Sequence, residues 1–145
     1  MLQIISPTVE LALVTNQPDA MLHFYRDVLG LPYAQYLEFP SPTGNQDLGV
    51  PRGFQHRLRC GDMLLKITHC PGAEIAQAPR LEAYAQTGMR FVSIVVGNLR
   101  EAVAACRAAG ARVVIDTRCF EGNIYYAFVE DPDGNALELA GLVDD

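Results

Sequence analysis

A strand-like alternation of apolar and polar positions that passes into a helical pattern occurs twice in the chain. At residues 8–14 every second residue is Val or Leu, which is typical of a strand with one buried face. A helix is predicted next, with Asn16 as its N-cap, Pro18 in its first turn and Gly30 at its end. Its apolar residues have the spacing of one helical face: Met21, Phe24, Tyr25 and Val28.

Residues 90–110 repeat this plan. Every second residue of the segment 92–96 is Val or Ile, which predicts another strand with one buried face. Asn98 and Glu101 have the spacing of a capping box, and Gly110 marks the end of the helix that they begin. The apolar stripe of this helix is formed by Leu99, Ala102, Val103 and Cys106.

Three strand-like runs follow each predicted helix, so each half of the chain has the order β-α-β-β-β and the fold class is α+β. The runs are 33–39, 54–60 and 63–69 in the first half, and 111–118, 124–130 and 136–141 in the second. We expect a single domain, 1–145, with module one at about 8–69 and module two at about 89–143. The Pro- and Gly-rich segments between them predict a long binding loop at 40–53 and a linker at 70–88.

The amino-acid composition and net charge of the chain exclude several classes of function. The chain has 145 residues, half of them hydrophobic, which suffices for one well-packed domain. Its net charge of −6, without a basic run, argues against a nucleic-acid partner. With no apolar stretch of roughly 20 residues and no signal-peptide pattern, we expect a cytoplasmic protein without a membrane partner. The four cysteines lack disulfide or metal spacing and are expected to be free.

Three segments resemble the vicinal oxygen chelate superfamily: FYRDVLGL, RAAGARV and FVEDPDGNALEL. This superfamily includes glyoxalase I, extradiol dioxygenases, methylmalonyl-CoA epimerase, and the fosfomycin and bleomycin resistance proteins. The resemblance implies two tandem βαβββ modules that form a cupped mixed sheet with helices outside and a small-molecule cavity inside. It also implies a homodimer, in which the modules can be exchanged between subunits. The fold does not choose a reaction, because it hosts enzymes as well as metal-free binding proteins.

Metal-using members of this superfamily hold a divalent ion with side chains from the first and fourth strands of each module. The matching positions here are Glu10, Lys66, Phe91 and Glu138. Glu10 and Glu138 can hold a hard cation, but an ammonium group and a phenyl ring cannot coordinate one. The three histidines do not lie at the ligand positions. We therefore expect a metal-free cavity with no cofactor, and, if a divalent metal binds, Glu10 and Glu138 as its ligands.

Lys66 is the only lysine in the chain, and our hypothesis is that its charge replaces the metal ion. Together with Glu10 and Glu138 it leaves one net negative charge in the cavity, so one carboxylate is expected to have a raised pKa and to transfer a proton. Two alternatives remain open. The three side chains can form a purely structural salt-bridge cluster, or Lys66 can extend into solvent without a partner.

Strand alternation directs further side chains toward the expected cavity. Five of them are candidate ligand contacts: Thr68, Phe91, Ser93, Tyr126 and Phe128. Ala12 and Leu64 lie on the same faces. The lining suits a small organic or aromatic ligand, although Tyr126 and Phe128 can equally be core residues. Arg57 and Arg59, which alternate on one strand, either steer an anionic substrate or solvate a sheet edge.

Two functions remain for this chain. It is a small-molecule-binding or resistance-type protein in which Lys66, Glu10 and Tyr126 orient the ligand, or it is a lyase, isomerase or dioxygenase. The enzyme would use a divalent metal, or Glu138 as a general base with Lys66 stabilising an oxyanion. The sequence does not decide between them, nor whether one chain or two complete the cavity.

Overall fold

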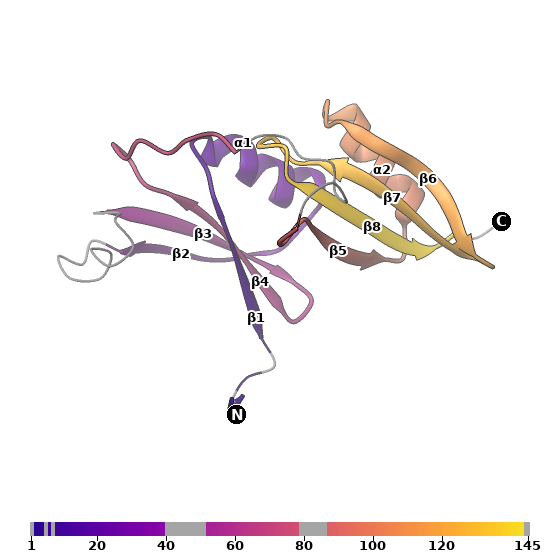
Figure 1. Cartoon of the computed structure of the whole chain (residues 1–145), viewed down its shortest axis with the longest axis horizontal. Helices are drawn as coiled ribbons and strands as arrows, with labels where there is room; N and C mark the ends of the chain where they lie inside the picture. Colours follow the sequence, from indigo (N-terminus) through magenta and orange to yellow (C-terminus); the bar gives the residue numbers. More distant parts are fainter. Residues whose placement is uncertain (1, 5, 7, 40–51, 79–86, 144–145) are drawn as a thin grey trace. The chain divides into compact units, whose positions relative to one another are not determined.

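A computed structural model describes residues 2–4, 6, 8–39, 52–78 and 87–143. The chain divides into two compact units, Met1–Ala76 and Gln77–Asp145 (Figure 1). Most of the predicted loop 40–53 and the middle of the predicted linker 70–88 lie outside the described residues. No helix in the described ranges is long and apolar enough to cross a membrane.

The first unit contains one mixed four-stranded sheet with one helical segment. Its elements are β1 (Val9–Val14), α1 (Pro18–Leu22), a π-helical continuation (His23–Val28), β2 (Tyr33–Phe39), β3 (Gly53–Cys60) and β4 (Met63–His69). The strand order is β1-β4-β3-β2, with β1 parallel to β4 and the other neighbours antiparallel.

The second unit repeats this architecture. Its elements are β5 (Phe91–Val96), α2 (Leu99–Ala108), β6 (Val113–Glu121), β7 (Ile124–Glu130) and β8 (Ala136–Leu142), in the strand order β5-β8-β7-β6. The α+β class and the two βαβββ modules are confirmed. Strand β6 begins two residues later and ends three residues later than the predicted run 111–118, and its pairing with β7 contains several register shifts. Such irregular pairing is not visible in a hydrophobic pattern.

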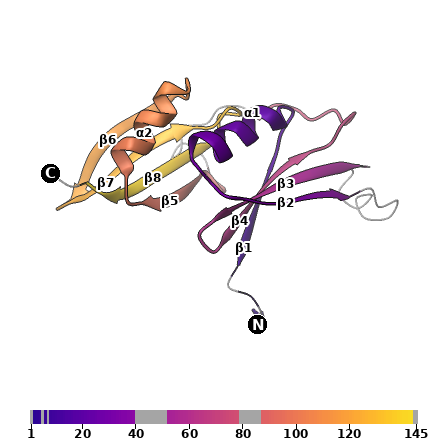
Figure 2. The same ribbon diagram turned by 180° about the vertical axis from the view of Figure 1, so that it is seen from behind.

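Each helix lies over one face of its own sheet, as both views of the ribbon show (Figures 1 and 2). In the first unit the core between helix and sheet contains Met21, Phe24, Tyr25, Leu58, Leu65 and Ile67. In the second it contains Leu99, Val103, Cys106, Ala127, Val129, Leu137 and Leu139. Because side chains alternate along a strand, the intervening residues lie on the opposite side of each sheet, which we call the helix-distal face.

The start of the first helix differs from the prediction. Gln17, not Asn16, is the N-cap residue, and its side chain makes no capping hydrogen bond. The Thr15 hydroxyl accepts a hydrogen bond from the Gln17 N–H at 2.9 Å, while the Asn16 side-chain amide donates to the Ile75 carbonyl at 2.9 Å. Pro18 lacks an N–H, so one of the donors that a cap would satisfy is absent.

The second half of the first helix is π-helical, which the α-helical spacing did not predict. The Leu29 N–H donates to the Phe24 carbonyl at 3.0 Å, a spacing of five residues. The adjacent rings of Phe24 and Tyr25 in this segment are both buried, in an edge-to-face contact at 5.2 Å between centroids.

In the second helix Asn98 is the N-cap residue as predicted, but the capping box is wrong. The Asn98 side-chain amide donates to the Glu101 carboxylate at 3.3 Å, and no cap bond to the backbone forms. Gly30 and Gly110 follow the two helices with φ of 72° and 80°, a conformation that L side chains rarely adopt.

Candidate functional site

The helix-distal face of the first unit carries an ion pair between Lys66 on β4 and Glu10 on β1. The parallel register places Glu10 opposite Leu64 and Ala12 opposite Lys66, so the two charged residues are diagonal neighbours. The Lys66 ammonium donates to the Glu10 carboxylate. The Lys66 side chain is 18% exposed and the Glu10 side chain 42%, so the ammonium is the more enclosed partner. Lys66 therefore does not extend unpaired into solvent.

The ion pair determines the protonation of Glu10. The hydrogen bond from Lys66 lowers the pKa of the Glu10 carboxyl below its ordinary value, against a smaller opposing effect of desolvation. The positive charges of Lys66 and then Arg57 lower this pKa further. The expectation of a raised pKa is therefore wrong for Glu10, because an adjacent ammonium favours the ionised form more than burial disfavours it.

Two further polar residues of β3 lie beside this pair. The antiparallel register places Arg57 opposite Lys66 and Gln55 opposite Thr68. The Arg57 guanidinium donates to the Gln55 side-chain oxygen at 3.3 and 3.4 Å. Strand β3 lies between β4 and β2, so the interpretation of Arg57 and Arg59 as charges on a sheet edge is wrong. Sequence reasoning missed Gln55, although its position two residues before Arg57 places it on the same face.

Thr68 completes this group of side chains. It is only 6% exposed, and its hydroxyl oxygen is buried without a hydrogen-bond partner among the described residues. Buried hydroxyl groups normally have a partner. Thr68 is therefore the member of the predicted set whose hydrogen-bonding capacity the described protein leaves unused.

The second unit carries a separate polar pair on its own helix-distal face. The parallel register of β5 and β8 places Ser93 opposite Glu138. The Ser93 hydroxyl donates to the Glu138 carboxylate. Glu138 is half-buried, whereas Ser93 is exposed. The hydroxyl thus orients a carboxylate that retains other lone pairs for a ligand.

Aromatic rings flank Glu138 on this face. Phe128 lies opposite Glu138 on β7, and its ring meets Phe91 edge-on at 5.2 Å and Tyr126 at 6.2 Å. Phe128 is 2% exposed, which agrees with the alternative that it is a core residue. Phe91 and Tyr126 are half-buried and present the more accessible ring surface.

The positions that the resemblance assigns to metal ligands differ in their ability to coordinate a divalent cation. Among the residues that the structure describes, no three or more His, Cys, Asp or Glu side chains are grouped in a way that could hold a metal ion. Lys66 and Phe91, at two of the four positions that the resemblance assigns to ligands, have no lone pair to donate. The Glu10 carboxylate is already paired with an ammonium group.

The histidines and cysteines have other environments. His56 is hydrogen-bonded to the Tyr33 hydroxyl at 2.8 Å, and His69 to the Thr15 carbonyl at 2.9 Å. All four cysteines are free, as predicted. Burial raises the pKa of the thiols of Cys60, Cys70 and Cys106, which makes them poor nucleophiles at neutral pH.

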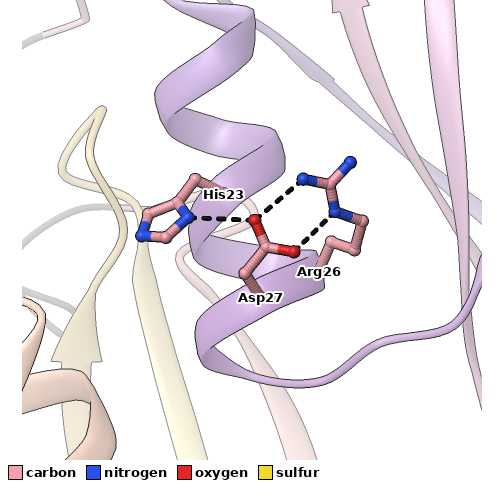
Figure 3. Close-up of polar contacts among 3 residues, drawn as sticks. All are labelled: His23, Arg26 and Asp27. Carbon is pink, nitrogen blue, oxygen red and sulfur yellow. Dashed lines mark hydrogen bonds and ion pairs between the residues drawn. The ribbon is translucent and has the colours of Figure 1, made fainter.

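A separate charged cluster lies on the surface of the first helical segment. His23 and Arg26 both converge on the Asp27 carboxylate (Figure 3). The histidine approaches it at 2.9 Å, and the guanidinium at 2.6 and 2.8 Å. The Arg26 hydrogen bonds, followed by that of His23, hold the pKa of Asp27 far below its usual range. These side chains are exposed on the helix rather than on the helix-distal face, so they belong to a solvated surface cluster.

The repeated βαβββ fold and the match to a family model define the class of this protein. Residues 8–139 match the model of the Glyoxalase/Bleomycin resistance protein/Dioxygenase superfamily. The chain therefore belongs to this superfamily, which confirms the resemblance of the three segments. A comparison with curated protein sequences finds no match.

Solved structures share the fold at low sequence identity. A glyoxalase family protein from Bacillus cereus aligns with a TM-score of 0.79 and 14% identity, covering 99% of this chain and 97% of its own. The trypanothione-dependent glyoxalase I of Leishmania major aligns with a TM-score of 0.65 and 23% identity, covering 91% of this chain and 84% of its own. A glyoxalase family protein from Enterococcus faecalis aligns with a TM-score of 0.59 and 23% identity, covering 95% and 96%. At these identities the likeness establishes the fold and not the reaction.

Proposed function

We propose that this chain is a small-molecule-binding member of the superfamily that works without a divalent metal, using Lys66 where relatives use an ion. The observation that carries the proposal is the ion pair between Lys66 and Glu10. An ammonium group that is 18% exposed and already paired supplies positive charge at that position. A metal ion bound beside it would have to overcome like-charge repulsion.

The side chains on the helix-distal faces suit an organic ligand. On the face of the first unit, Leu64 offers apolar surface beside the polar groups of Lys66 and Glu10. On the face of the second unit, Phe91 and Tyr126 offer aromatic surface, and the Tyr126 hydroxyl is a further polar group. Small-molecule sites combine these features, a mostly apolar lining with a small number of placed polar groups. The ligand class that fits is a small organic or aromatic compound with one or two polar groups.

The first experiment is elemental analysis of protein purified without chelator, followed by titration with manganese, iron(II), nickel and zinc. We expect no stoichiometric metal and no tight binding of any of the four ions. A tightly held divalent ion that is lost in Glu138→Gln would overturn the proposal in favour of a metal-dependent enzyme.

The second experiment tests Lys66 directly. A library of small neutral and charged compounds is titrated calorimetrically into wild type, Lys66→Met and the control Arg100→Met, which removes an exposed charge from α2. We expect Lys66→Met to weaken ligand binding and the control to leave it unchanged. Because Glu10 is 42% exposed, it can be hydrated after the loss of its partner, so this variant is expected to fold. Unchanged binding in Lys66→Met contradicts the proposal.

Turnover assays separate binding from catalysis. The test compounds are 2-oxoaldehyde thioadducts, catechols and acyl-CoA thioesters, offered to wild type and Glu138→Gln. We expect no turnover. Turnover that disappears in Glu138→Gln would identify an enzyme with this carboxylate as general base and would refute the binding-protein proposal.

A homodimer is part of the proposal, because the resemblance implies one. Light scattering of the purified chain is expected to give twice the monomer mass. A monomer at micromolar concentration would contradict this point and leave the ligand proposal to its own tests.

A further inference from the structure

Positive charge exceeds negative charge at the centre of the helix-distal face of the first unit. Arg57 and Lys66 are direct cross-strand neighbours on β3 and β4. Like charges in this relation destabilise a sheet unless something compensates them. Glu10 compensates one of the two, through its ion pair with Lys66. Among the residues that the structure describes, no carboxylate forms an ion pair with the other positive charge, that of Arg57.

Arg57 has unused hydrogen-bonding capacity. A guanidinium carries five N–H donors in a planar fork. The described residues offer it only the Gln55 side-chain oxygen, at 3.3 and 3.4 Å, which is long for a hydrogen bond from a charged donor. None of the described carboxylates forms an ion pair with it. Arg57 is also half-buried, so water does not fully replace a missing partner.

Thr68 provides an independent indication of a ligand. Its hydroxyl is buried and unpartnered in the described structure. Thr68 lies opposite Gln55, two register positions from the pair Arg57 and Lys66 and therefore next to that pair on the same face. An unsatisfied buried hydroxyl is costly, which favours a bound group that can pair with it. A guanidinium, an ammonium and a hydroxyl thus occupy adjacent positions on one face of two neighbouring strands.

We propose that Arg57, Lys66 and Thr68 form an oxyanion subsite that binds the carboxylate of a small organic acid. This inference rests on the proposed small-molecule function and names its ligand class. A single uncompensated charge matches a carboxylate better than a doubly charged phosphate monoester. The guanidinium can bind the two carboxylate oxygens with two N–H groups, and the hydroxyl can donate to one of them. Leu64 and Ala12, on the same face, provide apolar surface for the body of the acid.

The test uses acids and their neutral amides as matched pairs: benzoate with benzamide, phenylacetate with phenylacetamide, and hexanoate with hexanamide. Each is titrated calorimetrically into wild type, Arg57→Gln, Arg57→Lys and the control Arg100→Gln. We expect wild type to prefer each acid that binds over its amide. Arg57→Gln should weaken acid binding by about 10- to 100-fold and leave amide binding unchanged, as expected for loss of a charged hydrogen-bonding partner. The control should behave like wild type.

Arg57→Lys keeps the charge without the planar fork and should fall between wild type and Arg57→Gln. It also provides the test if Arg57→Gln does not fold. Phenyl phosphate, titrated alongside benzoate, should bind more weakly than the carboxylate; tighter binding would assign the subsite to phosphate esters instead.

The outcomes separate this inference from the proposed function. Equal binding of acids and amides, or acid binding that survives both Arg57 variants, overturns the carboxylate subsite. The same holds if no acid binds while neutral compounds of the library do. If neither acids nor neutral compounds bind to wild type, the small-molecule function itself is wrong.

Discussion

Glu10 and Lys66 lie 56 positions apart in the sequence and are diagonal neighbours across the parallel pair β1–β4, where the ammonium of one donates to the carboxylate of the other. This pairing requires the crossover that brings the fourth strand beside the first. The helix lies on the other face of the sheet (Figures 1 and 2), and the side chains of the pair are 18% and 42% exposed. The fold thus places the only lysine of the chain beside Glu10 on the helix-distal face and not in the core between helix and sheet.

The ion pair predicts a pH dependence of stability. The pKa of Glu10 is lowered in the folded chain, so its ionised form stabilises the fold above pH 4.5, and this contribution is lost as the pH falls through the lowered value. In urea unfolding, wild type should be more stable than Glu10→Gln at pH 7, and the gap should narrow at pH 3. A gap of equal size at both values would mean that the carboxylate does not act through its charge.

The Asp27 carboxylate should also stabilise the fold more at neutral pH than in acid, but it should not contribute to ligand binding. Its pKa is lowered by Arg26 and His23, so the stabilisation that it provides is present at neutral pH and lost in strong acid. We expect Asp27→Asn to lower the urea midpoint slightly at pH 7, because the cluster is exposed and screened by solvent. Calorimetric ligand affinity should be unchanged. A loss of affinity would place the surface cluster in the binding machinery.

Gly141 is predicted to be the least replaceable glycine of the second unit. It pairs with Val96 across β5–β8, and a Cβ added to it would collide with the Val96 carbonyl oxygen and lie 3.2 Å from its carbon. Both atoms are backbone, so relief requires movement of a strand. We expect Gly141→Ala to destabilise the chain by about 1–3 kcal/mol or more in urea unfolding.

Gly97→Ala is the matched control for this prediction. Gly97 follows Val96 directly, at the end of β5. Its backbone is not in the left-handed region, and a Cβ added to it would meet nothing within 4 Å. Its stability should stay within about 0.5 kcal/mol of wild type. Equal effects of the two substitutions would mean that the collision at Gly141 is relieved without cost.

Strand alternation predicted which residues share a face because that property depends only on local geometry. Glu10 and Lys66 in one unit, and Ser93 and Glu138 in the other, lie on the faces that the pattern assigns to them. Strand order is not local, and it rules out one of the two alternatives for Arg57, that of a charge on a sheet edge. A strand with alternating charged residues has the same sequence pattern whether it lies at the edge or inside a sheet. Only the pairing of β3 with both β2 and β4 shows that it is an inner strand.

Capping and helix type were predictable only in part. Asn16 has the residue type of an N-cap, yet the neighbouring Thr15 hydroxyl accepts the hydrogen bond from the Gln17 N–H. The Asn16 side-chain amide donates instead to the Ile75 carbonyl, 59 residues away. The missing partner of the Thr68 hydroxyl is equally invisible in the sequence, because it depends on every atom around that side chain.

Thr68→Val should separate the demands of folding from those of binding. The variant keeps the shape of the side chain and removes a buried hydroxyl that has no partner among the described residues. If that hydroxyl serves a ligand, its removal from the free protein relieves a desolvation cost, so the free energy of unfolding in urea should stay the same or rise, by up to about 1–3 kcal/mol. Affinity for the carboxylates that bind wild type should fall by roughly 2- to 10-fold, as expected for one lost hydrogen bond. Thr68→Ser, which retains the hydroxyl, should keep that affinity.

A Thr68→Val variant that is less stable than wild type and binds acids with the same affinity would show that the hydroxyl supports the fold instead. Stability and affinity that move in opposite directions are therefore the signature of a group held in place for a ligand.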